Sequence, residues 1–206
     1  MNIMATAIDS LPTAHSCAGM PQLCSTGLSE NWLLKECGDR HWETISRSTG
    51  QSSASLRDIL GRRLYAAFTS VHVRDATLGA VRENDPLQLD TRWCAASRSQ
   101  RYSQHEVRTS RGSVAQVEML SVFVSRERAG DNRSVVRSAL AGARDPASAS
   151  PSRLAAAAEA CAESARAVRA GAWMERVGIQ TAGGPGPPAG PADKAGGVVR
   201  VGVMPR

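Results

Sequence analysis

The residues that could take part in catalysis include a histidine and two carboxylates in one stretch whose apolar residues have helical spacing. His41 falls on the apolar stripe of this stretch, and Glu36 and Asp39 lie beside that stripe. A histidine can transfer protons near neutral pH, and a helical carboxylate can act as general base or nucleophile in hydrolysis. Each has a plainer interpretation. A histidine on an apolar stripe is more often a core residue, and carboxylates on a helix usually face solvent.

The start of the same helix offers a second kind of chemistry. Ser29 fits the N-cap position, and Glu30 follows in the first turn, where the helix dipole favours negative charge. Unpaired backbone N–H groups at this point could hold an oxyanion, with the Asn31 side chain as a further donor. An ordinary capped helix explains the same residues, and caps are far commoner than oxyanion holes.

The elements that must position these groups can be predicted from spacing. A helix is expected over about residues 30–48, ending near Gly50. After Gly61 the apolar period becomes two, which predicts a strand over residues 63–73. One face of that strand should carry the even-numbered residues 64, 66 and 68, and the other the odd-numbered residues through 73. Further strands are predicted over residues 87–93, 97–107 and 114–124.

These elements predict an α+β fold. The last residues of the strand predicted over 114–124 are apolar on both faces of the strand. This strand should therefore lie centrally in its sheet. A short extended segment at 20–23, one long helix and four strands form an order in which an antiparallel sheet wraps a single buried helix. The expected folded unit is about 19–140.

The two ends of the chain have different compositions from this unit. Residues 1–18 are small, polar and aperiodic, which predicts a disordered leader. Residues 141–206 are rich in Ala, Gly and Pro, which predicts a mostly disordered tail. A helix could form over 151–178, but it would present little more than alanine, so we expect no packed role for it. The tail should therefore be dispensable for folding.

Composition excludes several classes of function. Eight aromatic residues are too few for an RNA-binding surface of stacked rings, and the net charge of +6 divides equally between 1–140 and 141–206. A nucleic-acid binder would usually cluster that charge, so no nucleic-acid partner is expected. No apolar run approaches the roughly 20 residues of a membrane span, so no membrane partner is expected either.

Cysteine usage and the N-terminus bear on location. Five cysteines without a C-x-x-C pair argue against a zinc site and against a complete disulfide framework, and no metal is expected. The first residues lack the basic region of a signal peptide. The expected location is the cytoplasm.

Several strings taken together resemble a known family. The chain is similar to the N-terminal domain of the leinamycin-pathway bifunctional acyltransferase/decarboxylase family of polyketide biosynthesis. The resemblance covers about residues 19–140. It rests on Gly-Met-Pro-Gln-Leu at 19–23, Gly-Leu-Ser-Glu-Asn-Trp-Leu-Leu-Lys-Glu at 27–36, Gly-Asp-Arg-His-Trp at 38–42, Gly-Arg-Arg-Leu-Tyr-Ala at 61–66, Arg-Glu-Asn-Asp at 82–85 and Val-Glu-Met-Leu-Ser-Val-Phe at 117–123.

The resemblance implies a hot-dog fold and an activity. Family members decarboxylate methylmalonyl-CoA through a tyrosyl ester and deliver propionyl to an acyl carrier protein, with no cofactor beyond the CoA thioester substrate. Carried over, this makes Tyr65 the acyl acceptor. A phenol, with a pKa of about 10, needs a nearby cation or base, and Arg62 and Arg63 are its neighbours. The implied catalytic residues are Tyr65, His41 and Asn31, and the implied substrate-binding residues are Ser29, Glu30, Arg62 and Arg63.

The chain also departs from the family pattern, because it has no room for the second hot-dog half of these proteins. The sequence thus predicts a single hot-dog domain that pairs with a second copy or with a separate partner hot-dog. Two other functions stay open. One is an acyl-CoA thioesterase that uses Glu36 or Asp39, and the other is a truncated relative without catalysis. A strand tyrosine that merely packs against the helix would fit the last of these.

Overall fold

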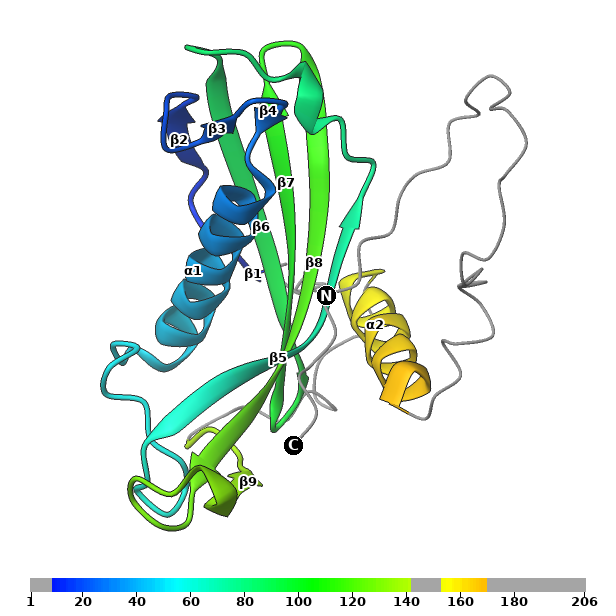
Figure 1. Ribbon diagram of the computed structural model, residues 1–206. Coiled ribbons are helices and arrows are strands. Elements are labelled where there is room, and N and C mark those ends of the chain that lie inside the picture. Colours follow the sequence, from blue (N-terminus) through cyan, green and yellow to red (C-terminus); the bar gives the residue numbers. More distant parts are fainter. Residues whose placement is uncertain (1–8, 142–152, 170–206) are drawn as a thin grey trace, which may run out of the picture.

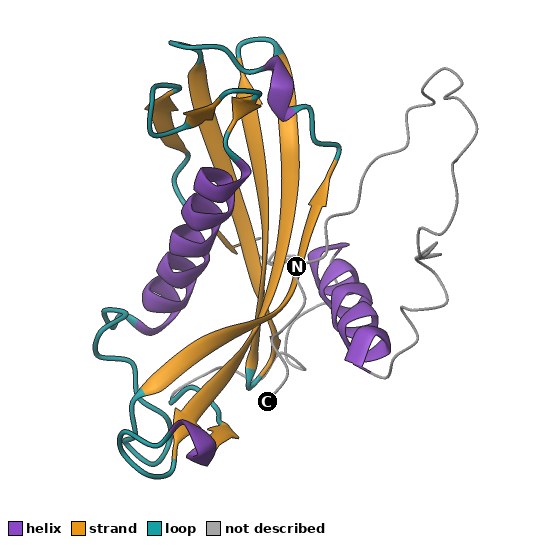
Figure 2. Cartoon of the chain, in the orientation of Figure 1, coloured by secondary structure: helices purple, strands orange, loops and turns teal. Residues whose placement is uncertain are grey.

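The computed structural model describes residues 9–141 and 153–169. A long antiparallel sheet curves around one helix, α1 (Glu30–Thr49), and a second helix, α2 (Arg153–Arg169), lies on the other side of the sheet (Figure 1). Figure 2 shows that strands and loops make up most of the rest.

The order of the strands defines the fold. The main sheet has the order β1-β6-β7-β8-β5, with β2 also pairing with β6 and β9 with β8. The first long strand after α1 therefore lies at the far edge, and the next three fill the space between it and the N-terminal strands. This is a hot-dog fold. Its strands are β1 (Asp9–Ser10), β2 (Ala14–Cys17), β5 (Leu64–Arg74), β6 (Pro86–Ser97), β7 (Gln100–Thr109), β8 (Gly112–Arg126) and β9 (Val135–Arg137).

Smaller elements complete the two ends of the sheet. Two short strands form a hairpin just before α1, and a single 3₁₀ turn follows β5. A second 3₁₀ turn leads into β9. These elements are β3 (Leu23–Cys24), β4 (Gly27–Leu28), η1 (Leu78–Ala80) and η2 (Asn132–Ser134).

The central helix matches its prediction within one residue at its C-terminal end. The Ser29 hydroxyl caps its start by accepting a hydrogen bond from the Trp32 backbone N–H at 3.3 Å, and Gly50 ends it with φ 66°. The apolar stripe that faces the sheet includes Leu33, Cys37 and Ile45, all fully buried. That burial, rather than helix propensity, fixes the helix against the sheet.

The face pattern predicted for β5 holds only for its first half. A register shift between Phe68 and Ser70 places one extra residue in the strand. Beyond that bulge the odd-numbered Val71 and Val73 pack into the same core cluster as Phe68, instead of facing away from it. The bulge therefore reverses the alternation that simple period-two spacing predicts.

The predicted disordered leader is wrong for residues 9–18. Within this range β1 and β2 both pair with β6, from Asp9 opposite Trp93 to Cys17 opposite Pro86. Ala18 is fully buried. Backbone pairing orders a segment whose side chains give little apolar signal, so composition misses it. Residues 1–8 lie outside the described residues.

The expectation that the tail has no packed role is also wrong for α2. Leu154, Ala158, Cys161 and Ala162 form a buried cluster with Tyr102 and Leu120 of the sheet. The alanines that seemed too small to pack instead let the helix approach the sheet closely. The rest of the predicted tail and of the helix predicted over 151–178 lies outside the described residues.

Replacing Leu154 with alanine tests this contact. Leu154 is 8% exposed, so the substitution should lower the free energy of unfolding by about 2–3 kcal/mol. The solvent-facing Ala156 is the matched control, and Ala156→Ser should change that free energy by less than about 0.5 kcal/mol. Chemical denaturation measures both. Equal stability of Leu154→Ala and the parent chain would show that α2 contributes no packing.

Candidate functional site

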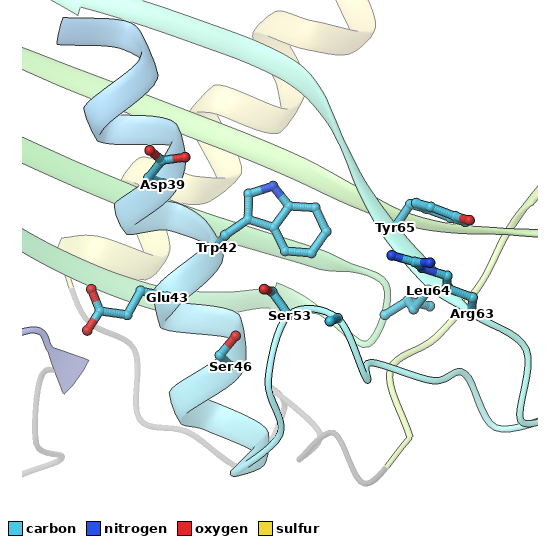
Figure 3. A pocket seen from close by; sticks show the side chains of 9 residues that line it. Asp39, Trp42, Glu43, Ser46, Ser53, Arg63, Leu64 and Tyr65 are labelled. Carbon is cyan, nitrogen blue, oxygen red and sulfur yellow. The ribbon is translucent and has the colours of Figure 1, made fainter. Parts of the chain in front are cut away.

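An open pocket lies between the C-terminal half of α1, the loop that follows it and the start of β5. Its volume is about 660 Å³. Figure 3 shows the Trp42 indole reaching from α1 toward Tyr65 and Arg63 of the facing wall. The lining residues are Asp39, Trp42, Glu43, Ser46, Ser53, Ala54, Arg63, Leu64 and Tyr65.

Tyr65 is the best-built reactive group of this pocket. Its half-buried phenol oxygen accepts a hydrogen bond from Arg126 Nη1 at 3.1 Å. The guanidinium carbons of Arg63 and Arg126 lie 5.5 and 4.9 Å from the centre of its ring. Two cations therefore lie beside this ring. Arg126 Nε is buried and has no hydrogen-bond partner among the described residues.

The two predicted arginines have separate roles. Arg63 lines the pocket, but Arg62 points into a structural ion pair, with Nε 2.8 Å from Asp58 Oδ2. Burial alone would raise the pKa of Asp58. Hydrogen bonds from the backbone and side chain of Arg62 and from Ser138 instead hold that pKa well below its usual range. Arg62 thus anchors its hairpin rather than a substrate.

His41 lies in the core rather than in the pocket. Its side chain has no exposed surface, its Nδ1 is 2.6 Å from Ser103 Oγ, and its Nε2 is 2.7 Å from Ser121 Oγ. The ring also meets Phe68 edge-on, with 5.1 Å between centroids. Both ring nitrogens are therefore engaged, which fits the plainer interpretation of His41 as a core residue.

The hydrogen bonds of His41 continue through the core. Ser103 Oγ lies 2.8 Å from His105 Nε2, and His105 Nδ1 lies 3.0 Å from Thr91 Oγ1. Ser121, His41, Ser103, His105 and Thr91 thus form one buried polar chain between α1 and the sheet. Every member is at most 1% exposed. Because each group has a partner, the chain fixes how α1 sits on the sheet.

This polar chain predicts acid sensitivity. Burial, with a smaller contribution from the charge of Arg40, lowers the pKa of His105 to about 3, and burial also lowers the pKa of His41 well below 6.5. The unfolded chain therefore binds more protons below pH 6.5, so stability is complete above that pH and falls as pH decreases. His105 alone should contribute a loss of about 2 kcal/mol between pH 6.5 and 4.5, with His41 adding in the same direction.

Urea denaturation across this pH range measures the slope. Because glutamates begin to titrate near the lower end of this interval, the contribution of the histidines is obtained by comparison with a variant that lacks one of them. His105→Gln, which cannot take up the proton, should flatten the slope. A stability that is constant from pH 6.5 to 4.5 would contradict the buried neutral state of both histidines.

The helix start and Tyr65 are not brought together within one chain. Asn31 and Glu30 are exposed, and the hydroxyl of Ser29 serves as the helix cap. Eleven residues separate Asn31 from Trp42 of the pocket, which corresponds to about 16 Å along the helix axis. The oxyanion candidates therefore cannot reach a carbonyl that Tyr65 attacks in the same subunit.

The two helical carboxylates differ in position. Asp39 lines the pocket, whereas Glu36 does not. Lys35 Nζ lies 2.6 Å from Asp39 Oδ2 in an exposed ion pair, and Asp39 Oδ1 forms no hydrogen bond with another described residue. Of the two predicted carboxylates, Asp39 is thus the one that could meet a ligand in this pocket.

A second polar cluster lies under α2, on the opposite face of the sheet. Ser70 Oγ is 3.1 Å from His72 Nε2, and His72 Nδ1 is 3.7 Å from Glu118 Oε2. Glu118 also accepts hydrogen bonds from Tyr102 and Arg74, at 3.0 and 2.9 Å. Ser70, His72 and Glu118 are each less than 9% exposed. The cluster serves as a polar anchor beneath the helix.

Sequence reasoning missed Trp42 of the pocket wall and Arg126, which contacts Tyr65 but is not among the lining residues. Arg126 is 61 residues from Tyr65, and it comes close because β5 pairs antiparallel with β8, with Tyr65 opposite Val124. Trp42 belongs to the Gly-Asp-Arg-His-Trp string. Its side chain lines the pocket because of the way α1 is rotated about its axis against the sheet, which the string alone does not indicate. The antiparallel order of two predicted strands could have indicated Arg126.

Comparisons with known proteins agree only loosely with this architecture. No protein-family model matches the chain, and no curated protein matches it. Among solved structures, a DHNA-CoA thioesterase from Staphylococcus aureus shares 12% identity at a TM-score of 0.47, over 61% of this chain and 78% of that one. A 1,4-dihydroxy-2-naphthoyl-CoA thioesterase from Synechocystis shares 15% identity at 0.44, over 55% and 81%.

A hexameric acyl-CoA thioesterase in its apo form shares 13% identity at a TM-score of 0.45, over 82% of this chain and 94% of that one. Because these likenesses are distant, the fold assignment rests on the strand order and the central helix of the chain itself. No described helix is long and apolar enough to cross a membrane. The described residues also contain no group of three or more His, Cys, Asp or Glu side chains that could hold a metal.

Proposed function

We propose that the chain cleaves acyl thioesters of coenzyme A or of an acyl carrier protein in the pocket that Tyr65 lines. The observation that carries the proposal is the phenol of Tyr65, hydrogen-bonded to Arg126 and flanked by Arg63. The positive charge there stabilises an oxyanion as the C–S bond breaks. A volume of about 660 Å³ suits an acyl group with its pantetheine arm. The hot-dog fold and the family resemblance support the same substrate class.

One course of the reaction transfers the acyl group to Tyr65, and the Arg126 hydrogen bond favours it. The phenol oxygen attacks the thioester carbonyl, the C–S bond breaks, and the phenolic proton passes to the departing thiolate. A carrier-protein thiol then attacks the aryl ester and regenerates the phenol. With a methylmalonyl group, loss of carbon dioxide leaves an enolate that is protonated to propionyl.

The other course is hydrolysis, favoured by the position of Asp39 in the pocket with one oxygen unpaired. Asp39 accepts a proton from water, the resulting hydroxide attacks the carbonyl carbon, and the C–S bond breaks. The products are a carboxylic acid and a free thiol. This course leaves no acyl group on the protein.

The deciding experiment incubates the full chain with methylmalonyl-CoA and, separately, with propionyl-CoA. Thiol release shows cleavage, and the intact mass of the protein shows whether an acyl group is retained. An adduct supports transfer through Tyr65, whereas thiol release without an adduct that is lost in Asp39→Asn supports hydrolysis. Neither release nor adduct with either substrate would overturn the proposal and leave a non-catalytic relative.

We also propose that two copies of this hot-dog domain pair with each other. β5 forms one edge of the sheet and has no strand partner beyond it among the described residues. Pairing across an edge would let the helix start of one copy approach the pocket of the other. Sedimentation at low micromolar concentration should show a species near twice 21.8 kDa. A stable monomer there would favour a separate partner hot-dog.

A further inference from the structure

Exposed aliphatic side chains gather at one end of the molecule. Ile59 and Leu60, 72% and 70% exposed, occupy the tip of the hairpin formed by residues 57–63. Val135, 43% exposed, lies in β9 at the same end, which is the lower end of the sheet in Figure 1. The remaining large exposed hydrophobic residue in the described part of the chain is Met20, just before β3 at the other end.

The tip is held in place by the buried carboxylate of Asp58. This carboxylate accepts hydrogen bonds from the backbone N–H groups of Leu60 and Arg62, at 2.9 and 2.8 Å, and from Ser138 Oγ at 2.9 Å. Gly61 adopts φ +74°, which allows the tight turn. Ile59 and Leu60 are therefore displayed outward by a fixed turn, although burying them would be favourable.

The positive charge of the folded unit is concentrated at the same end. Residues 56–63 and 126–141, called here the basic-apolar end, carry seven arginines and three acidic residues, a net charge of +4. The other residues of 1–140 carry ten basic and eleven acidic side chains. The diffuse charge inferred from the sequence is therefore wrong for the folded unit. Four exposed arginines form no ion pair with a described residue: Arg57, Arg63, Arg133 and Arg137.

The size and chemistry of this end select among partners. A second copy would bring like charges together, which opposes pairing through this end. A stable protein interface needs about 800 Å² from each partner and usually aromatic anchors, and three aliphatic side chains supply neither. A lipid surface needs no such complementary shape. It requires only an apolar group that inserts among the lipids and cations that contact the lipid phosphates. Together these two interactions give stable attachment.

We propose that the basic-apolar end docks on an anionic lipid surface. Ile59 and Leu60 enter the boundary between headgroups and acyl chains, and the exposed arginines contact lipid phosphates. The sequence predicted no membrane partner because no apolar run is long enough to span a bilayer. Docking on a lipid surface does not require a spanning segment. The proposal is independent of thioester cleavage and goes beyond it.

Vesicle co-sedimentation with the full chain tests the proposal. The probes are vesicles of phosphatidylcholine with phosphatidylserine, and vesicles of phosphatidylcholine alone. The chain should bind the anionic vesicles, and added salt should weaken that binding. The Ile59→Ser/Leu60→Ser double variant should bind at least about 10-fold more weakly, and Arg133→Ser/Arg137→Ser about 20-fold more weakly.

Matched controls come from the same chain. Met20→Ser removes an equally exposed apolar side chain, and Arg92→Ser/Arg166→Ser removes two exposed charges elsewhere, so both should bind like the parent. No binding of the parent to anionic vesicles would overturn the proposal. So would equal binding by the Ile59/Leu60 double variant. If soluble polyglutamate binds as tightly as the vesicles, the partner is an acidic protein surface and the lipid assignment is wrong.

Discussion

Replacing Tyr65 with phenylalanine should eliminate the acyl adduct and reduce acyl transfer by roughly 1,000-fold or more. The substitution removes the oxygen that would form the ester while keeping the ring between Arg63 and Arg126. Because the phenol is half-buried and makes one hydrogen bond, the free energy of unfolding should fall by no more than about 1 kcal/mol. Intact-mass analysis after incubation with methylmalonyl-CoA, together with thermal denaturation, measures both effects.

The other tyrosine of the chain provides the matched control. Tyr102 is fully buried beneath α2 and donates its hydroxyl to Glu118 at 3.0 Å. Tyr102→Phe should leave the acyl adduct intact but lower the free energy of unfolding by about 1–3 kcal/mol, because a buried carboxylate loses a donor. Undiminished adduct formation in Tyr65→Phe would sink the tyrosyl course, and hydrolysis through Asp39 would remain.

The second large effect is expected from His41→Ala, which should lower the free energy of unfolding by about 3–5 kcal/mol. The change removes a fully buried ring packed against Phe68 and leaves the hydroxyls of Ser103 and Ser121 without their partner. A cavity and unpaired buried polar groups both destabilise the folded state. Urea denaturation near pH 7.5 gives the value without interference from histidine protonation.

His15 is the control for this substitution, since it is an exposed histidine on β2. His15→Ala should change the free energy of unfolding by less than about 0.5 kcal/mol. Comparable small changes for both variants would show that the buried polar chain contributes little to stability.

The elements predicted from the sequence were those with strong local signals. The helix over residues 30–49 has an N-cap at Ser29, an apolar stripe and a terminating Gly50, and all three act within the helix itself. The strand that became β6 had an alternating pattern and the one that became β8 ended in residues apolar on both faces, whereas the segment that became β7 was largely polar. The order of these elements was enough to indicate a sheet around one helix.

The parts that could not be predicted depend on distant partners. β1 and β2 are held by backbone pairing to β6, and this pairing does not require a particular pattern of side chains. The bulge after Phe68 depends on how β5 meets β8, and α2 packs only because the sheet offers Tyr102 and Leu120. In each case tertiary contacts, rather than local propensity, decide the outcome.

In the candidate site, too, some residues were predictable from local sequence and others depend on distant contacts. Tyr65 and Arg63 were predicted as neighbours because they belong to one short string, and both line the pocket. Arg62, in the same string, turns to Asp58 because a buried carboxylate needs a cation and hydrogen bonds. His41 joins a buried network whose members come from α1, β6, β7 and β8, and no single segment reveals that network.

The indole in the pocket wall gives the protein an optical signal of its own. Trp42 lies between α1 and the Tyr65 wall, so an occupant of the pocket would replace water around its ring (Figure 3). Indole emission shifts to shorter wavelength as its surroundings become less polar. Trp93, by contrast, lies under the Arg101 guanidinium at 4.5 Å and is not part of the pocket wall. Occupancy of the pocket can therefore be followed by fluorescence, without a label and before any bond is broken.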